Sequence, residues 1–194
     1  MDIELRPATV DDIPHLARFL QMAGGGLMDA VYHDLIPGKS TAEIMEHRYT
    51  NEETSSWYRN YWVATYQSQV AGGLNLFPAD DPRNNWSDPL VPKERTAVYE
   101  PFKHLEAPGS LIINVTAVDP EFRGKGIARR LLHLARKQAK DRGFSTLSLH
   151  VFEQNEEAVK LYLSFGFEII RRTPIVPHDL IRYTGDMVLM SCSA

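Results

Sequence analysis

The feature that most constrains this chain is an apolar stretch that runs directly into a glycine-containing loop and a basic helix. Residues 111–118 are apolar and β-branched, which is typical of a central strand. Asp119-Pro120 ends the strand, because proline lacks the N–H that a sheet ladder needs. Residues 123–128 contain two glycines and lead into a helix, whose free N–H groups and dipole favour an anion. The stretch therefore predicts an anion-binding site at a strand-to-helix junction.

Length and composition indicate one ordinary globular domain over residues 1–194. With 43% hydrophobic and 24% charged residues, the chain can bury a sizeable core. A net charge of −4 argues against nucleic-acid binding by bulk electrostatics. Cys192 is the only cysteine, which excludes an internal disulfide and a cysteine-cluster metal site. No apolar run reaches membrane-spanning length and no signal pattern is present, so we expect a cytoplasmic protein that binds no membrane.

Basic residues are concentrated after the predicted central strand. Residues 123–142 hold eight of the 21 Lys and Arg residues, and only Asp141 opposes them. We expect Arg136 to Arg142 to form a solvated helix face, and the basic residues beside the glycine loop to bind an anionic ligand.

The N-terminal part predicts a strand at 3–6 and then two helices. Thr9 begins a capping-box-like sequence before the first helix, and the second should run from Ser40 to Asn51. Residues 62–66 and 70–77 predict a hairpin, in which two adjacent glycines indicate a bulge or close packing.

Three other patterns carry less weight. Gly24-Gly25-Gly26 is interpreted as a flexible connector, since no strand precedes it to make a phosphate-binding loop. Asp29, His33 and Asp34 have a spacing that a metal could use on a helix, but surface polar residues are the preferred interpretation, and no metal is expected. Residues 78–110 are rich in proline and predict an insertion or long loop, with one short helix near 94–105, that acts as a lid or specificity element.

The C-terminal half predicts alternating helices and strands. A helix should follow the glycine loop and end at Gly143, and Asn155 should cap a second helix. Further strands are expected at 146–151, 167–171 and 186–191. The order predicts an α/β (α+β) fold with a mixed, largely antiparallel twisted sheet of about six or seven strands flanked by helices. Residues 111–118 and 146–151 should pair in parallel through a right-handed crossover.

The glycine loop does not fit two common nucleotide-binding motifs. The phosphate-binding loop G-x-x-x-x-G-K-S/T is absent, and the dinucleotide motif G-x-G-x-x-G fails because Arg129 occupies the third glycine position. The chain also lacks the repeated β-α units of a dinucleotide-binding fold.

Two blocks of the sequence resemble the signature of the GNAT superfamily of N-acetyltransferases. The family motif Q/R-x-x-G-x-G/A is matched at 123–128, after a V-x-P-E-F turn at 118–122. The second motif, N-x-x-A-x-x-L-Y-x-x-x-G-F, is matched in register by Asn155, Ala158, Leu161, Tyr162, Gly166 and Phe167. The resemblance is specific over about 111–170, the expected coenzyme A-binding core.

The resemblance implies acetyl-coenzyme A as co-substrate and assigns roles to particular residues. The pyrophosphate would lie on backbone amides of Arg123, Gly124, Lys125, Gly126, Ile127 and Ala128. The pantetheine arm would pair with the strand at Ala117 and Val118, and an N–H near Val118 would stabilise the oxyanion. Asn155 would contact the cofactor, or act only as a helix cap. Tyr162 would protonate the leaving thiolate, or be a packed core tyrosine.

A general base is not identified by the sequence. Some members of the family use a carboxylate on the central strand, but residues 111–118 contain none, and Asn114 is their only strongly polar side chain. The candidates elsewhere are Glu100, His150, Asp34 and Glu153, although His150 is also interpreted as a satisfied core histidine. An amine of lowered pKa would need no dedicated base.

The resemblance implies an N-acetyltransferase that moves an acetyl group from acetyl-coenzyme A to an amine of a small metabolite or peptide by direct attack. One alternative is a non-catalytic acyl-coenzyme A-binding or regulatory module. Another is a nucleotide-binding domain, which ATP or NAD would stabilise. The acceptor site is expected within 24–60, 78–110 and 173–186, and a homodimer is compatible with the sequence.

Overall fold

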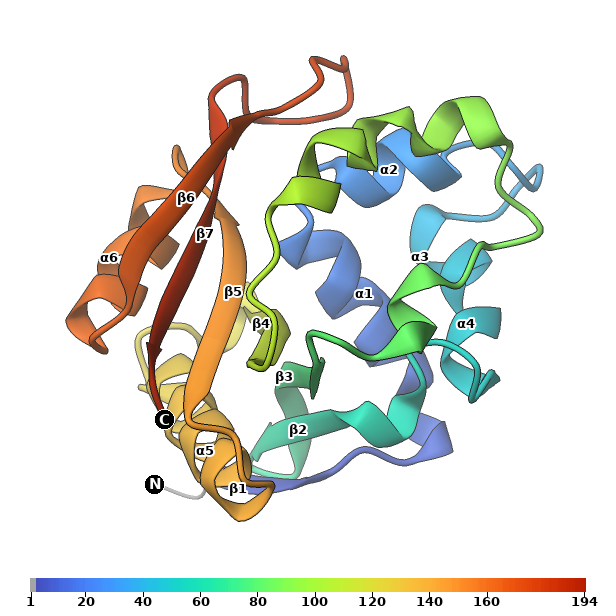
Figure 1. Ribbon diagram of the computed structural model, residues 1–194. Helices are drawn as coiled ribbons and strands as arrows, with labels where there is room; N and C mark the ends of the chain where they lie inside the picture. Colours follow the sequence, from blue (N-terminus) through green and yellow to red (C-terminus); the bar gives the residue numbers. More distant parts are fainter. Residues whose placement is uncertain (1–2) are drawn as a thin grey trace.

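The computed structural model describes residues 3–194, apart from the side chains of residues 103 and 104. Seven strands of this part form one open sheet in the order β1-β2-β3-β4-β5-β7-β6 (Figure 1). The strands are β1 Ile3–Pro7, β2 Tyr61–Tyr66, β3 Gln69–Pro78, β4 Leu111–Val118, β5 Thr146–Phe152, β6 Glu168–Pro174 and β7 Asp186–Ser193. Only β4 and β5 pair in parallel, and all other neighbours are antiparallel. The predicted mixed, largely antiparallel sheet is confirmed.

Helices cover both faces of the sheet. The α-helices are α1 Ile13–Ala23, α2 Leu27–Tyr32, α3 Thr41–Met45, α4 His47–Thr50, α5 Ile127–Asp141 and α6 Glu156–Ser164. The 3-10 helices are η1 Val10–Asp12, η2 Tyr58–Asn60, η3 Pro82–Asn85, η4 Lys93–His104 and η5 Pro120–Phe122. Among the described residues, no helix is both long and apolar enough to cross a bilayer.

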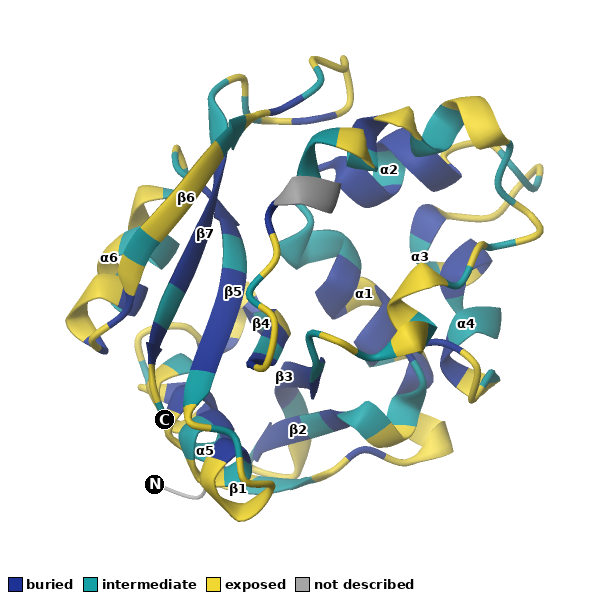
Figure 2. Cartoon of the chain, viewed as in Figure 1, coloured by how far each residue is buried: buried dark blue, intermediate teal, exposed yellow. Residues whose placement is uncertain are grey.

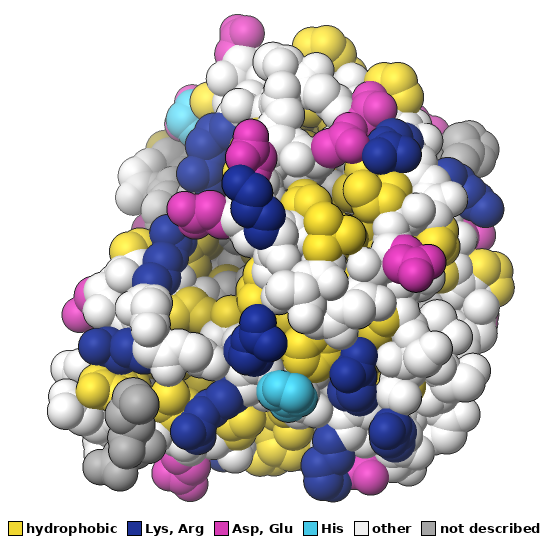
Figure 3. Space-filling model, turned by 90° about the vertical axis from the view of Figure 1, so that its left-hand side faces the viewer, with side chains coloured by type: hydrophobic (Ala, Val, Ile, Leu, Met, Phe, Trp, Pro, Cys, Tyr) yellow, Lys and Arg dark blue, Asp and Glu magenta, His cyan; other side chains and the backbone are white. Residues whose placement is uncertain are grey.

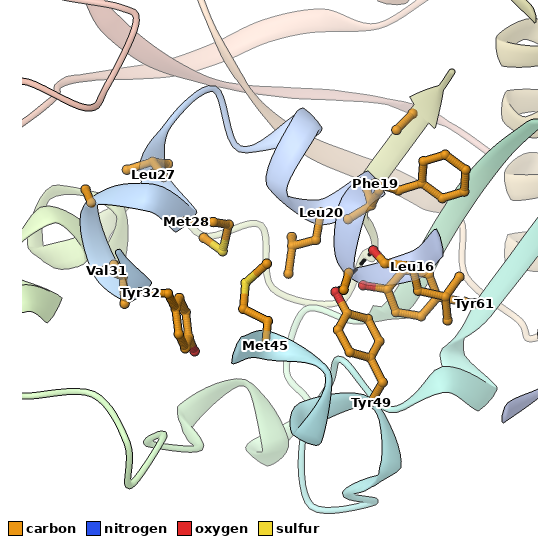
Figure 4. Close-up of a cluster of buried hydrophobic side chains, with 14 of the residues drawn as sticks. Leu16, Phe19, Leu20, Leu27, Met28, Val31, Tyr32, Met45, Tyr49 and Tyr61 are labelled. Carbon is orange, nitrogen blue, oxygen red and sulfur yellow. Dashed lines mark hydrogen bonds between the residues drawn. The ribbon is translucent and has the colours of Figure 1, made fainter. Parts of the chain in front are cut away.

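Two hydrophobic cores lie on opposite faces of the sheet. One joins α5 and α6 to the sheet and includes Ile127, Leu131 and Phe167. The other joins α1, α2 and α3 to the opposite face, and Figure 4 shows Leu16, Met45 and neighbouring side chains in it. Figure 2 shows that β5 and β7 are mostly buried, while the edge strand β6 is mostly exposed. The central strands therefore have a packed layer on each side.

Strand β4 contains a bulge, so its buried odd-numbered residues divide between the two cores. The β3 residues Asn75 and Leu76 face Val115 and Ile113, so Asn114 is the extra residue on β4. Leu111 and Ile113 consequently belong to the α5 core, whereas Val115 belongs to the α1 core. The Asn114 amide donates to Asn75 Oδ1 at 3.0 Å. The bulge thus places one polar side chain of β4 at the centre of the sheet.

The helix predicted from Ser40 to Asn51 is instead two short helices, α3 and α4. Ser40 caps α3 through a capping box with Glu43, as its sequence indicates. The helix is interrupted at Glu46, and the turn there points Tyr49 toward α1. The Tyr49 hydroxyl donates to the Leu16 carbonyl at 3.2 Å (Figure 4).

The Gly24-Gly25-Gly26 segment is a packed turn and not the flexible connector predicted. Gly26 has a φ of +103°, and a Cβ there would lie 1.9 Å from the Leu180 carbonyl oxygen. Arg182 N donates to the Gly25 carbonyl at 3.0 Å. Glycine is needed because the loop between β6 and β7 packs directly on this backbone.

Arg136 is also not on the solvated helix face predicted for it. Its guanidinium stacks 4.4 Å from the centre of the Phe165 ring and donates to the Phe165 carbonyl. Lys137 and Lys140 are exposed, as expected.

Candidate active site

The sheet opens where β4 and β5 separate. The two strands pair over only three residues, Leu111 to Ile113 with Leu147 to Leu149. Beyond Ile113, β4 continues to Val118 and remains paired with β3 on its other side. The β4 edge that faces β5 therefore has backbone groups free for a ligand, which can pair with them as a strand would. Ala117 and Val118, the predicted pantetheine contacts, lie on this open edge.

The glycine loop is open in the same region. Gly124 and Gly126 have φ values of +75° and +78°, and a Cβ at either would meet nothing within 4 Å. Gly126 is the N-cap of α5, so the first amides of the helix, beginning at Ile127 and Ala128, have no intrahelical partner. Left-handed glycines, free amides and open space are the features that an anion needs.

Cations flank this loop, although several already contact the protein. Lys125 Nζ lies 5.0 Å from the centre of the Tyr66 ring, and Arg123 Nε donates to the Val118 carbonyl at 3.3 Å. Arg129 donates to Ser164 Oγ at 3.1 Å, which joins α5 to α6. The face that carries α5, α6 and β6 shows Lys and Arg side chains between hydrophobic ones (Figure 3). Lys125, Arg123 and Arg129 near the loop would attract an anionic ligand, although Asp and Glu side chains also lie on this face (Figure 3).

Tyr162 reaches β4 beside the open edge. Its ring packs against Phe167, with 5.7 Å between the ring centres, and the residue is almost fully buried in the α5 core. Burial raises the pKa of Tyr162 to about 12, and the nearby Thr116 hydroxyl opposes part of that rise. The buried Thr116 hydroxyl itself makes no hydrogen bond of regular geometry. Tyr162 is thus a core residue with a protonated phenol. It also lies next to the part of β4 that β5 leaves uncovered.

Asn155 is the N-cap of α6. Its Oδ1 accepts from Ala158 N at 3.4 Å, which is a long hydrogen bond. The cap predicted from the sequence is therefore present, and contact with a cofactor stays a prediction.

A cavity of about 600 Å³ lies on the other face of β4 and β5, within the size range of small-molecule sites. Asn114, Ser148 and His150 line it from the sheet. About half of its lining comes from residues 78–110, which pass over it as η3 and η4 (green in Figure 1). Residues 78–110 therefore cover this cavity, and their role as a lid or specificity element stays a prediction, whereas 173–186 supplies none of the described lining residues. A second hollow of about 470 Å³ lies between the start of α1 and α4, away from β4.

Two of the four candidate bases line this cavity. His150 Nε2 lies 2.6 Å from the Leu105 carbonyl oxygen, which can only accept, so Nε2 carries the proton and Nδ1 is left as an acceptor. Burial lowers the pKa of His150, which keeps the imidazole neutral. Glu100 also lines the cavity.

The other two candidate bases lie elsewhere. Asp34 is exposed and pairs with His33 at 2.8 Å, and Glu153 pairs with Arg172 at 3.1 Å. Asp29 accepts from Gln21 at 2.7 Å, and no group of three potential metal ligands is found in the described part of the chain.

A polar cluster at the far end of the cavity was not predicted. Arg48 Nη1 donates to the Tyr32 hydroxyl at 2.6 Å, which in turn donates to Asp88 Oδ2 at 2.8 Å. His47 Nε2 lies 3.0 Å from the same carboxylate oxygen, and the Trp86 ring lies beside the Arg48 guanidinium. These residues come from α2, α4 and the segment after η3, so no local spacing in the sequence connects them.

These features define the class to which the chain belongs. The sequence blocks predicted a parallel strand pair with a glycine loop and Tyr162 beside it, and the structure has these elements together; the point at which the two strands separate comes from the structure. The sequence model described as the acetyltransferase (GNAT) family matches residues 28–167. The chain belongs to this family, and the predicted class of GNAT-type acyltransferase is confirmed.

Individual relatives agree with this assignment. The chain is 35% identical over 135 residues to the uncharacterized N-acetyltransferase YdgE of Bacillus subtilis, covering 66% of this chain and 69% of that protein. It is 30% identical over 108 residues to human N-acetyltransferase 8B, covering 56% of this chain but only 38% of that protein.

Solved structures share the fold. The chain resembles an N-acetyltransferase from Staphylococcus aureus Mu50 with a TM-score of 0.73 and 19% identity, covering 97% of this chain and 100% of that one. It also resembles the PaiA N-acetyltransferase from Thermoplasma acidophilum, solved in complex with coenzyme A, with a TM-score of 0.58 and 16% identity over 100% of both chains.

Proposed function

We propose that this protein is an N-acetyltransferase that uses acetyl-coenzyme A and an amine acceptor. The observation that carries the proposal is the separation of β4 and β5 after Ile113, which opens the edge of β4 beside Tyr162 and lies next to the cavity. Acetyl-coenzyme A would enter this opening from one side, and the acceptor amine would reach its thioester from the other.

The cofactor would be held mainly by backbone groups. The pyrophosphate would lie on the amides from Arg123 to Ala128, where two left-handed glycines leave open space. The pantetheine arm would hydrogen-bond to β4 at Ala117 and Val118, in place of the missing β5 partner. Acetyl-coenzyme A supplies the activated acetyl group, and no metal is needed for this chemistry.

Direct transfer requires two proton movements. The amine nitrogen attacks the thioester carbonyl, a C–N bond forms, the C–S bond breaks, and the sulfur leaves as a thiolate. Tyr162 would protonate the thiolate, because it lies beside the open edge of β4 and burial keeps its phenol in the protonated form. A backbone N–H near Val118 would stabilise the oxyanion.

His150 is the base that the geometry favours. A protonated amine is no nucleophile, so the acceptor must lose a proton before or during attack. His150 lines the cavity from β5, immediately after Leu149, the last β5 residue that pairs with β4. Its ring is neutral and its Nδ1 is an acceptor. We propose that Nδ1 accepts the proton, directly or through a water, from an amine bound in the cavity.

The test is a turnover screen. Release of free coenzyme A would be followed with a panel of amines, polyamines, amino acids and peptides, together with binding of acetyl-coenzyme A, ATP and NAD by thermal shift. The proposal expects stabilisation by acetyl-coenzyme A and turnover of at least one amine. Tight coenzyme A binding without turnover of any amine would indicate a binding module, and stabilisation by ATP or NAD instead would contradict the cofactor assignment.

A further inference from the structure

The cavity is lined by a partly buried arginine that, in the part of the chain that the structure describes, has no carboxylate in direct contact. Arg48 lines the cavity from α4, and none of the ion pairs formed by the described residues involves it. Its Nε is buried and has no hydrogen-bond partner, and its Nη2 makes only a long bond of 3.4 Å to Ser56 Oγ. Burial alone would lower the pKa of Arg48, and the charge of Asp88 helps to raise it without direct contact. A buried charge is still costly, so an anion in direct contact would stabilise the guanidinium further.

The nearest carboxylate is already occupied. Asp88 accepts from the Tyr32 hydroxyl at 2.8 Å, from Leu90 N at 3.0 Å, and lies 3.0 Å from His47 Nε2. Tyr32 stands between Asp88 and Arg48, because its hydroxyl accepts from the guanidinium and donates to the carboxylate. Asp88 therefore orients Arg48 through Tyr32 but does not pair with it directly.

The aromatic rings around Arg48 make it suitable for ligand recognition. The guanidinium carbon lies 5.5 Å from the centre of the Trp86 ring and 5.7 Å from that of Tyr32, whose place at the end of α2 is shown in Figure 4. Such stacking holds the planar fork in one orientation, so it can bind a carboxylate with two parallel hydrogen bonds at little entropic cost.

The same cavity connects this cation to the place where chemistry is proposed. Arg48 and Tyr32 line it at one end, and Asn114 and His150 line it at the sheet. Between them the walls are mostly apolar or aromatic, with Met28, Val31, Phe77, Tyr99 and Phe102. Glu100 and Glu106 add negative charge to the lining, which suits an ammonium group. One ligand can therefore place an anion at Arg48 and an amine near His150.

We propose that the acceptor carries a carboxylate that Arg48 binds, so that the preferred substrates are amino carboxylic acids or short peptides with an apolar body. This inference rests on the proposed function and specifies its acceptor. The carboxylate would replace the missing partner of the guanidinium, while the amine at the other end of the molecule is presented to the thioester.

The experiment compares paired acceptors that differ only in the carboxylate. An ω-amino acid, a dipeptide and a tripeptide, in which the amine and the carboxylate lie at opposite ends, would each be assayed beside the corresponding carboxamide. The wild-type protein should prefer the carboxylate by roughly 10- to 100-fold in kcat/KM, the range expected for charge-assisted hydrogen bonds. The member of the panel with the largest ratio distinguishes a free amino acid from a peptide as the source of the carboxylate.

Arg48→Met is the test variant and Arg95→Met is the matched control. Arg95 of η4, like Arg48 of α4, hydrogen-bonds to the end of α2, through the His33 and Val31 carbonyls, but it is not among the residues that line the cavity. In Arg48→Met the ratio of carboxylate to carboxamide should fall to near one, with the carboxamides still acetylated. In Arg95→Met the ratio should be retained. An equal ratio in the wild type and Arg48→Met, or a preference for carboxamides, would overturn the inference but leave the proposed function standing.

Binding provides a readout that does not require turnover. The N-acetylated dipeptide should raise the melting temperature of the wild type and of Arg95→Met, and its carboxamide should raise it less. Arg48→Met should lose this difference. If no amine is acetylated but the carboxylate ligand still raises the melting temperature more than its carboxamide does, the proposed function fails and the carboxylate site stands. If the N-acetylated dipeptide gives no more protection than its carboxamide in the wild type, the inference is wrong.

Discussion

The two faces of the sheet beside β4 use their polar groups in different ways. On the α5 face, the groups available to a ligand are backbone amides around Gly124 and Gly126, with open space beside them. On the α1 face, they are side chains such as Arg48, Tyr32 and Asp88, which are bonded to one another inside a cavity. The first arrangement suits the proposed cofactor, whose phosphates are always the same, and we call the α5 face around Gly124 and Gly126 the cofactor face. The second arrangement suits the proposed acceptor, which differs between members of a family, and we call the α1 face with the Arg48 cavity the acceptor face.

Tyr162 gives the most severe test of the cofactor face. Tyr162→Phe should lower kcat by about 10²- to 10⁴-fold, the usual contribution of a positioned acid, while acetyl-coenzyme A binds as before. Because burial raises the pKa of Tyr162 to about 12, the wild-type rate should not fall through loss of this proton until the pH approaches that value. Steady-state kinetics across pH would check both points, and an unchanged kcat would remove Tyr162 from the mechanism.

Substitution of Gly26 and of Gly126 by alanine should affect different properties: mainly the free energy of unfolding at Gly26, and mainly cofactor affinity at Gly126. A Cβ at Gly26 would lie 1.9 Å from the Leu180 carbonyl oxygen, so Gly26→Ala should lower the free energy of unfolding by about 2–5 kcal/mol. A Cβ at Gly126 meets nothing within 4 Å, so Gly126→Ala should cost only about 1–2 kcal/mol of left-handed strain.

The effect on cofactor binding should have the opposite order. Gly126→Ala should weaken acetyl-coenzyme A binding by at least about tenfold, because the strain and the new methyl group lie where the pyrophosphate would sit. Gly26→Ala should bind the cofactor normally at temperatures where it is folded. Denaturant unfolding and calorimetric titration of both variants make the comparison, and equal cofactor affinities would contradict it.

His150 tests the acceptor face through pH. Burial lowers the pKa of His150 below 6.5, so the imidazole is protonated, and lost as a base, only below that pKa. As the pH increases, kcat/KM should therefore rise through this pKa and then remain level. We call the rising part the acid limb of the profile. His150→Gln should lower kcat/KM by about 10²-fold and abolish that acid limb. A variant that retains the wild-type pH profile would show that the limb belongs to another group, with Glu100 the next candidate to substitute.

Asn155 is expected to have the smallest effect. Asn155→Ala removes a long capping hydrogen bond and should lower the free energy of unfolding by about 0.5–1 kcal/mol. Asn155→Asp keeps the cap and serves as the control. If the Michaelis constant for acetyl-coenzyme A rises in both variants, the side chain also contacts the cofactor; if it rises in neither, Asn155 is only a cap.

The sequence predicted the cofactor face better than the acceptor face, for physical reasons. The strand, the glycine loop and α5 are consecutive, so local patterns specify them. The Asn155–Phe167 block likewise places Tyr162 by helical spacing. The cluster of Arg48, Tyr32 and Asp88 is assembled from separate segments that only the tertiary structure brings together.

The errors have the same origin. Gly24 to Gly26 suggested flexibility, because the loop at Leu180 that packs on them is distant in the sequence. Arg136 was assigned to solvent, because its partner Phe165 belongs to another helix. The interpretation of His150 as a satisfied core residue agrees with its hydrogen bond to Leu105. The sequence did not show that His150 also lines a cavity, because that depends on where β4 and β5 separate.

Hydrogen exchange with and without acetyl-coenzyme A tests the central claim most directly, that the cofactor occupies the open edge of β4 and the glycine loop. The account predicts slower exchange at 114–118 and 123–128 when the cofactor is added, with much smaller changes over 86–100, which cover the acceptor cavity. Protection confined to 86–100, or no change at 114–118 under saturating acetyl-coenzyme A, would contradict it.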